Sequence, residues 1–188
     1  MSTHSDPHPA ITVAVVMRRV RIDGAMSRWQ SWRWELAEVV EQDVDLGDKP
    51  RLLYKNESEE RWLHPGFNVE LFTDDAEGYE LNVTTPSPCW FVMWRMEEQA
   101  GLADEPMAIP VLVSLSYHDA GRFLDAQETV EQVPAPDHIV QWVRAFAQEH
   151  RVIEAKKRKR PESFRPLTDR FGNPASVSTV KKFGAGNG

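Results

Sequence analysis

The chain has 188 residues, a net charge of −7 and a single cysteine, Cys89. This length suits one domain of ordinary size, and one cysteine excludes an intramolecular disulfide framework and a cysteine-rich zinc site. No apolar run approaches the roughly 18 residues of a membrane span, and residues 1–10 lack the positive start and apolar middle of a signal peptide. We therefore expect a cytoplasmic protein without a transmembrane segment.

Charge is divided unevenly along the chain. Residues 1–150 hold 12 Lys and Arg against 26 Asp and Glu, a net of −14, whereas residues 151–188 hold ten against three, a net of +7. The basic part includes five consecutive cations, Lys156, Lys157, Arg158, Lys159 and Arg160. Because such a division favours association more than folding, we predict a disordered lead over 1–10, one folded domain over 11–150 and a largely disordered basic tail over 151–188.

The first third of the chain has the composition of strands. Residues 11–20 are rich in β-branched side chains. Residues 32–40 alternate between large apolar and polar side chains, which favours a strand, although the same stretch fits a helix with Trp29, Trp32 and Leu36 on one side. Shorter strands are predicted over residues 51–54 and 61–64.

The central stretch predicts a hairpin followed by a buried strand. Apolar and polar residues alternate over 67–71 and again over 79–83, and the Asp- and Gly-containing segment 73–78 between them is typical of a turn. Residues 89–96 are apolar on both faces, with Arg95 as the polar interruption. A strand of that kind is covered on both sides, so we expect it to be central in its sheet.

Helices are predicted towards the end of the domain. A strand over 109–116 ends at Ser116, a good N-cap for a helix over 117–126. The segment 127–136 is predicted as a loop, and apolar residues at three- and four-residue spacing then predict a helix to His150. The fold class is therefore α+β: one twisted antiparallel sheet of about seven strands followed by two packed helices.

Familiar chemical motifs are missing from the sequence. There is no glycine-rich phosphate loop, no His-Glu-x-x-His and no Gly-x-Ser-x-Gly. Cys89 lies between Pro88 and Trp90 at the start of an apolar strand, which is typical of a buried, inert thiol. His118, Asp119, His138 and His150 would have to converge to bind a metal, and their spacing does not require it. We therefore expect no catalytic residue, cofactor or metal.

Six blocks of sequence carry a resemblance to a known family. They are VAVVMRR, RWQSWRWELAEVV, RWLHPG with the VEL that follows, EGYELNVTTPSPCWFVMWRME, SYHDAGRFLDAQE and KKRKRP. Over residues 11–161 the chain resembles a family of uncharacterised bacterial proteins often encoded beside genes for molybdenum-dependent formate dehydrogenase. The family has no established activity or catalytic residues. The resemblance therefore implies only a context, namely biogenesis, regulation or accessory service to such a dehydrogenase.

The first of three functional hypotheses is a non-enzymatic accessory or interaction protein that serves formate dehydrogenase. Its partner would be a dehydrogenase subunit or a maturation factor. Exposed tryptophans and the basic tail would bind that partner. The candidate partner-binding residues are Trp62, His64, Trp94, Arg95, Lys156, Lys157, Arg158, Lys159 and Arg160.

Two further hypotheses belong to other classes. A nucleic-acid-binding regulator would use the basic tail with Arg18, Arg19, Arg21 and Arg33. The charge of −14 on the body argues against it, and the interpretation favoured for the interleaved Trp and Arg residues is core filling and solvation. The third hypothesis is an enzyme or small-ligand protein with a pocket at Trp62, His64 and Trp94.

Overall fold

Strands precede and alternate with helices in the computed structural model, which describes residues 8–98 and 105–151. The described elements are β1 (Ala10–Arg21), the 3₁₀ turn η1 (Ala25–Arg28), β2 (Trp32–Glu41), β3 (Arg51–Lys55), β4 (Glu59–Glu70), the 3₁₀ turn η2 (Thr73–Asp75), α1 (Ala76–Val83), β5 (Cys89–Glu97), β6 (Met107–Ser114), α2 (Tyr117–Asp125), β7 (Thr129–Pro134) and α3 (Asp137–His150). The predicted α+β class is confirmed, with helices both between and after the strands.

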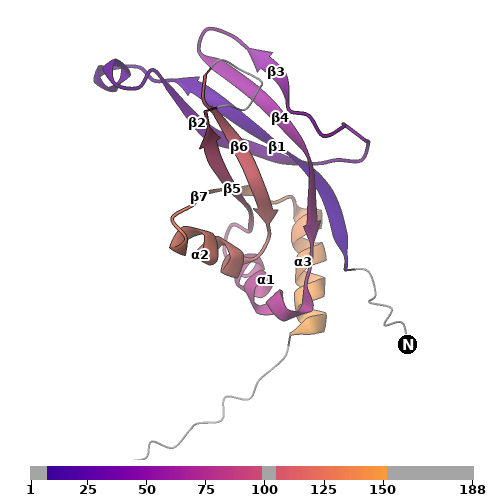
Figure 1. The fold of residues 1–188 in the computed structure, drawn as a ribbon. Coiled ribbons are helices and arrows are strands. Elements are labelled where there is room, and N and C mark those ends of the chain that lie inside the picture. The colour runs from indigo at the N-terminus through magenta and orange to yellow at the C-terminus, as the bar shows by residue number, and fades with distance from the viewer. Residues whose placement is uncertain (1–7, 99–104, 152–188) are drawn as a thin grey trace, which may run out of the picture. The chain divides into compact units, whose positions relative to one another are not determined.

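The strands form two antiparallel sheets (Figure 1). Sheet A has the order β2-β1-β4-β3, and sheet B has the order β6-β5-β7. The prediction of about seven strands therefore agrees with the structure, but they divide into two sheets. The central position predicted for the strand over residues 89–96 is confirmed, because β5 pairs with β6 on one side and β7 on the other.

One apolar layer lies between the two sheets and the helices. Val13, Val15 and Met17 alternate along β1 and reach it from sheet A, and Trp90 and Val92 reach it from sheet B. Helix α3 adds the buried side chains Ile139, Val143 and Phe146. In the view of Figure 1 the three α-helices gather at one end of the sheets. The helices thus cover this end of the apolar layer.

The predicted hairpin over residues 67–83 is wrong. Its first half belongs to the long strand β4, but its second half is helix α1. Ala76, Tyr79 and Val83 are buried at helical spacing, and the Tyr79 hydroxyl accepts a hydrogen bond from the N–H of Phe72 at 3.1 Å. In so short a segment, alternate and helical spacing share most positions, so packing decides between them.

The later elements were predicted more accurately. Helices α2 and α3 are confirmed, and Ser116 caps α2: its Oγ accepts the backbone N–H groups of His118 at 3.1 Å and Asp119 at 3.3 Å. The predicted loop over 127–136 is wrong in part, because it contains β7, the third strand of sheet B. Across the residues that the structure describes, no helix is long and apolar enough to cross a membrane.

Candidate functional site

The connection between β1 and β2, residues 22–31, projects beyond the rest of sheet A in Figure 1; we call it the arm. Hydrogen bonds hold it together: Ile22 N–H donates to the Ser31 carbonyl at 2.9 Å, and Ser27 Oγ donates to the Gly24 carbonyl at 2.6 Å. Gly24 has φ 93°, a conformation that favours glycine. The arm carries Trp29, whose side chain is 88% exposed.

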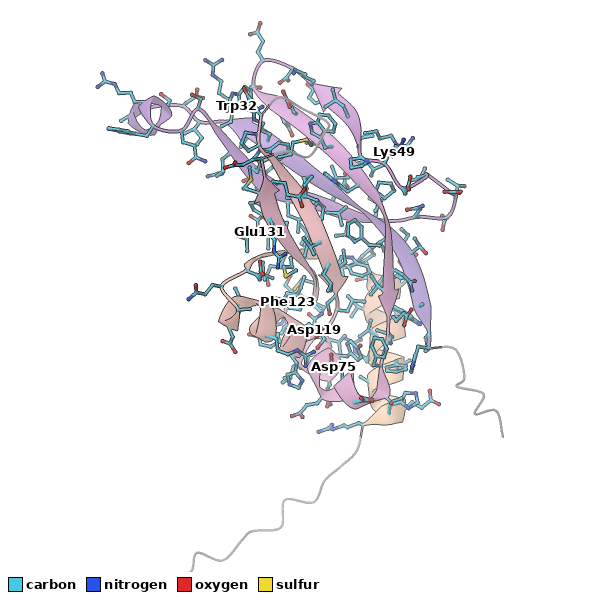
Figure 2. The ribbon with its side chains drawn as sticks, in the orientation of Figure 1. Trp32, Lys49, Asp75, Asp119, Phe123 and Glu131 are labelled. Carbon is cyan, nitrogen blue, oxygen red and sulfur yellow. The ribbon has the colours of Figure 1, made fainter. Side chains whose placement is uncertain are left out.

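At the base of the arm, the layer between the sheets opens into a cleft of about 520 Å³. Its lining residues are Arg19, Gln30, Trp32, Arg33, Trp34, Trp94, Met96, Glu105 and Pro106. We call this site the tryptophan cleft. Figure 2 shows Trp32 at the end of the sheets from which the arm projects. A cleft of this size is within the range of binding sites for small ligands or for side chains of a partner.

Strand register explains why these residues meet. Val13, Val15, Met17 and Arg19 share one face of β1, so this face changes from apolar to charged as it leaves the core. Across the sheet, Arg19 is paired with Trp34 of β2 and with Glu60 of β4. Directly paired residues point to the same side of a sheet. The cleft is therefore a continuation of the core layer in which a guanidinium replaces the valines.

Arg19 is the electrostatic centre of the tryptophan cleft. Its guanidinium carbon lies 4.7 Å from the centroid of the Trp32 ring, in cation–π geometry. It forms ion pairs with Glu105 and, at 3.9 Å, with Glu60. The Arg19 side chain is only 15% exposed. These contacts fix the planar guanidinium beside the aromatic wall.

Glu60 connects the cleft with Trp62. Burial tends to raise the pKa of Glu60, but hydrogen bonds from Lys55 and Trp62, together with the charges of Lys55 and Arg19, outweigh it and hold this pKa below its usual range. The Lys55 ammonium lies 3.0 Å from Glu60, and Trp62 Nε1 lies 3.5 Å from it. Glu60 is therefore held as a carboxylate among basic and aromatic groups.

Glu131 supports the floor of the cleft and joins the two sheets. Its Oε2 accepts a hydrogen bond from Trp94 Nε1 at 2.9 Å and another from the backbone N–H of Leu36 at 2.7 Å. Leu36 belongs to sheet A, whereas Trp94 and Glu131 belong to sheet B. Figure 2 places Glu131 between Trp32 and the helices. One carboxylate thus bonds the Trp94 ring of sheet B and the backbone of sheet A.

The structure brings only some of the candidate partner-binding residues together. Trp94 lines the cleft but is 9% exposed, and Trp62 adjoins the cleft through Glu60. His64 is deeper in sheet A, with 3% exposed, and burial lowers its pKa to about 4. Arg95 points to the opposite face of β5, where it pairs with Glu128. The five basic residues over 156–160 lie outside the described residues.

The exposed Trp29 and the cleft residues Trp32 and Trp34 were not among the candidates. The signal for them was the interleaving of Trp and Arg over residues 28–34. Composition alone could not show which of these tryptophans are buried in the core and which are exposed. The structure gives both outcomes: Trp34 packs against the core, and Trp29 is exposed. The nearby arginines are also engaged, since Arg18 and Arg33 pair with Glu35 at 2.6 and 3.0 Å.

The reactive groups Cys89, His118 and Asp75 lie outside the lining of the tryptophan cleft. Among residues 8–98 and 105–151, no group of three or more His, Cys, Asp and Glu could hold a metal ion. The Cys89 thiol is buried, and burial raises its pKa, so it is a poor nucleophile. His118 Nδ1 lies 3.2 Å from Asp75, a pair that reaches from α2 to η2.

Comparison with known proteins gives the family. Residues 12–160 match the family model described as "Protein of unknown function (DUF3305)", and the chain belongs to this family. No curated protein matches the chain. No solved structure matches it either.

Proposed function

We propose that this member of the DUF3305 family is a non-enzymatic accessory protein that binds a protein partner through the arm and the tryptophan cleft. The observation that carries the proposal is the position of Trp29, 88% exposed beside a cleft lined by three more tryptophans and two arginines. Tryptophan and arginine are enriched among the residues that dominate protein–protein binding energy.

The free energy of apolar burial favours a complex in which a partner covers Trp29. A tryptophan buries about 150–250 Å² when it is covered, which corresponds to roughly 4–6 kcal/mol of apolar burial before the entropic costs of binding. The arm limits these costs because its hydrogen bonds already order its backbone. Arg21, which directly precedes the arm, and Arg28, within it, are both exposed. A partner with an apolar pocket and an acidic rim would suit this surface.

The identity of the partner is proposed from the sequence resemblance. It is a subunit of a molybdenum-dependent formate dehydrogenase or one of its maturation factors. The basic run over residues 156–160 would add a second contact to an acidic partner. Nucleic acid is less favoured, because Arg18, Arg19 and Arg33 already pair with glutamates.

Affinity capture from native cell extract tests the proposal. Four versions of the protein are compared: the natural chain, Trp29→Ala, Leu124→Ala and a chain that lacks residues 155–188. Trp29 and Leu124 are both exposed, so neither substitution should change the fold. We expect Leu124→Ala to capture a dehydrogenase subunit or maturation factor as the natural chain does, Trp29→Ala to lose at least about tenfold, and the shortened chain to capture less.

Nuclease treatment separates the alternatives. If the captured material is lost when nuclease is added, nucleic-acid binding replaces the accessory proposal. If a protein partner is retained equally by Trp29→Ala and the natural chain, the arm is not the binding surface. If an extract that contains the dehydrogenase yields no partner, the small-ligand hypothesis for the cleft takes its place.

A further inference from the structure

A second surface of the domain lies at β3, the edge strand of sheet A. All five of its residues are exposed. The three central side chains are apolar or aromatic: Leu52, Leu53 and Tyr54 are 42%, 52% and 47% exposed. An edge strand presents unpaired backbone N–H and C=O groups, and exposed apolar side chains make it a template for another strand.

The other edge strands in the described part of the chain are β2 of sheet A and β6 and β7 of sheet B, and β7 is partly covered by β2 and α2. β2 lies against β7 and has one backbone N–H, that of Leu36, bonded to Glu131. β6 contains Pro110, which cannot donate to a ladder. β3 has β4 as its one paired strand in the described structure. It is therefore the edge strand with the least cover from other elements, and its pairing with β4 is irregular between Leu52 and Tyr54.

The ends of β3 select what can pair with it. Arg51 and Lys55 are both cations, at its first and last positions. If two copies of β3 paired antiparallel with all five residues matched, Arg51 of each copy would face Lys55 of the other, and like charges directly opposite are destabilising. A second copy of this chain is thus disfavoured in that register, whereas a strand with an acid at each end is favoured in either direction.

Both cations can accept a further partner. Lys55 lies 3.0 Å from Glu60 but its side chain is 62% exposed, and an ammonium has three donors. Arg51 donates to the Leu46 carbonyl at 3.2 Å, which leaves most of its five donors. The Tyr54 hydroxyl accepts a hydrogen bond from Asn56 Nδ2 at 2.7 Å. The Tyr54 side chain is therefore partly ordered before anything binds.

We propose that β3 binds an extended segment of a partner protein by strand addition, and that this segment has a short apolar run with an acidic residue at each end. Backbone hydrogen bonds would supply the affinity, and the two cations would supply the selectivity. The inference depends on β3 alone. It holds whether or not the arm binds a dehydrogenase.

Purified full-length protein and three synthetic peptides test it. The first peptide is Ser-Gly-Glu-Val-Thr-Val-Glu-Gly-Ser with blocked ends. The second has Lys in place of both Glu, and the third has Pro in place of Thr, which removes a ladder donor. We expect the first to bind with protection of the amides of residues 51–55 from hydrogen exchange, the second to bind at least about tenfold more weakly, and the third to fail.

Variants of the protein make the test specific. The double substitution Arg51→Glu with Lys55→Glu should reverse the preference towards the Lys peptide, a gain that unfolding could not produce. Leu53→Lys should abolish binding, while Leu124→Lys, on the exposed side of α2, should bind as the natural chain does.

Four results would overturn the proposal. They are equal binding of the Glu and Lys peptides, binding that survives Leu53→Lys, no binding of the Glu peptide at about 1 mM, and a self-associated protein that Leu53→Lys dissociates. The last result would show that β3 pairs with its own copy. Because the assay contains no cell extract, its failure is distinct from failure of the accessory function.

Discussion

Asn82 ties helix α1 to the ends of two strands in sheet B. Its Nδ2 donates to the backbone carbonyls of Cys89 and Leu115, both at 2.8 Å, and its Oδ1 accepts the Cys89 N–H at 3.1 Å. The side chain is 1% exposed. Three backbone groups that water cannot reach thus depend on one amide.

Removal of this amide should be costly. We expect Asn82→Ala to lower the free energy of unfolding by about 2–4 kcal/mol, because it leaves buried polar groups unpaired. Urea unfolding followed by fluorescence measures the change. Asn68→Ala is the matched control, since Asn68 is exposed and its side-chain amide donates to the Glu70 side chain; a loss as small as that of the control would contradict this role for Asn82.

His64 should make stability depend on pH. Its Nε2 has no hydrogen-bond partner in the described structure, and burial lowers its pKa from the ordinary 6.5 to about 4. Above pH 6.5 both the folded and unfolded states are neutral at this residue. As pH falls from 6.5 towards 4, only the unfolded state binds the proton, so stability is lost, by up to about 3 kcal/mol.

The comparison with His64→Leu isolates this contribution. We expect the difference in unfolding free energy between the natural chain and the variant to be constant above pH 7 and to move in favour of the variant between pH 6.5 and 4. Urea unfolding at a series of pH values gives both curves. Parallel curves across this range would show that His64 does not titrate as its burial implies.

At the scale of elements, two glycines in helices have opposite roles. A Cβ on Gly78 in α1 would lie 2.4 Å from Ser116 Oγ and 2.8 Å from Asp75 Oδ1, whereas a Cβ on Gly121 in α2 would meet nothing within 4 Å. Gly78 therefore permits α1 to approach the N-cap of α2. Gly121 only lowers helix propensity.

This difference predicts opposite signs for one substitution. Gly121→Ala should raise the free energy of unfolding by about 0.5–1 kcal/mol. Gly78→Ala should lower it by about 1–3 kcal/mol, because the Ser116 cap must move. Thermal or urea unfolding of the two variants side by side checks both values. A stabilising Gly78→Ala would mean that α1 and α2 are not in close contact.

The sequence predicts well those elements whose conformation is determined by residues close together in the chain. The β-branched run in β1, the doubly apolar β5 and the Ser116 cap each act within a few residues. Helix α1 was missed because its buried Asn82 and close-packed Gly78 have meaning only beside β5, β6 and α2. Likewise, the sequence of β7 is typical of a loop, and this segment is a strand because it pairs with β5.

The site was predictable only in outline. The sequence indicated Trp62 and Trp94 as partner-binding residues and Arg19 as one of four arginines for a nucleic-acid interface, but it could not predict that Arg19 lies at the centre of the tryptophan cleft. The reason is that Arg19 becomes central through its cross-strand partners, Trp34 and Glu60, which lie far away in the sequence. Arg95 was predicted to bind a partner together with Trp94. It is the next residue along β5, so its side chain points to the opposite face, away from the cleft.

For the whole molecule, Glu131 holds the two sheets together. We expect Glu131→Ala to lower the free energy of unfolding by about 2–3 kcal/mol, since it leaves the Leu36 N–H and Trp94 Nε1 without an acceptor. Glu131→Gln, which retains an acceptor oxygen, should recover part of the loss. Glu128→Ala is the control, because the Glu128 carboxylate pairs with the exposed Arg95. Equal losses for Glu131→Ala and Glu128→Ala would show that Glu131 does not stabilise the contact between the sheets.

The burial of Cys89 has a practical consequence. The chain's single thiol lies where α1, β5 and β7 meet, with Sγ 3.8 Å from Asn82 Oδ1 and 3.5 Å from Gln132 Oε1. A thiol reagent can reach it only when this junction opens. The alkylation rate of the folded chain, divided by that of the denatured chain, then measures how often this junction opens. If this ratio of rates falls when a partner is bound, binding at the arm reduces the opening of the junction around Cys89.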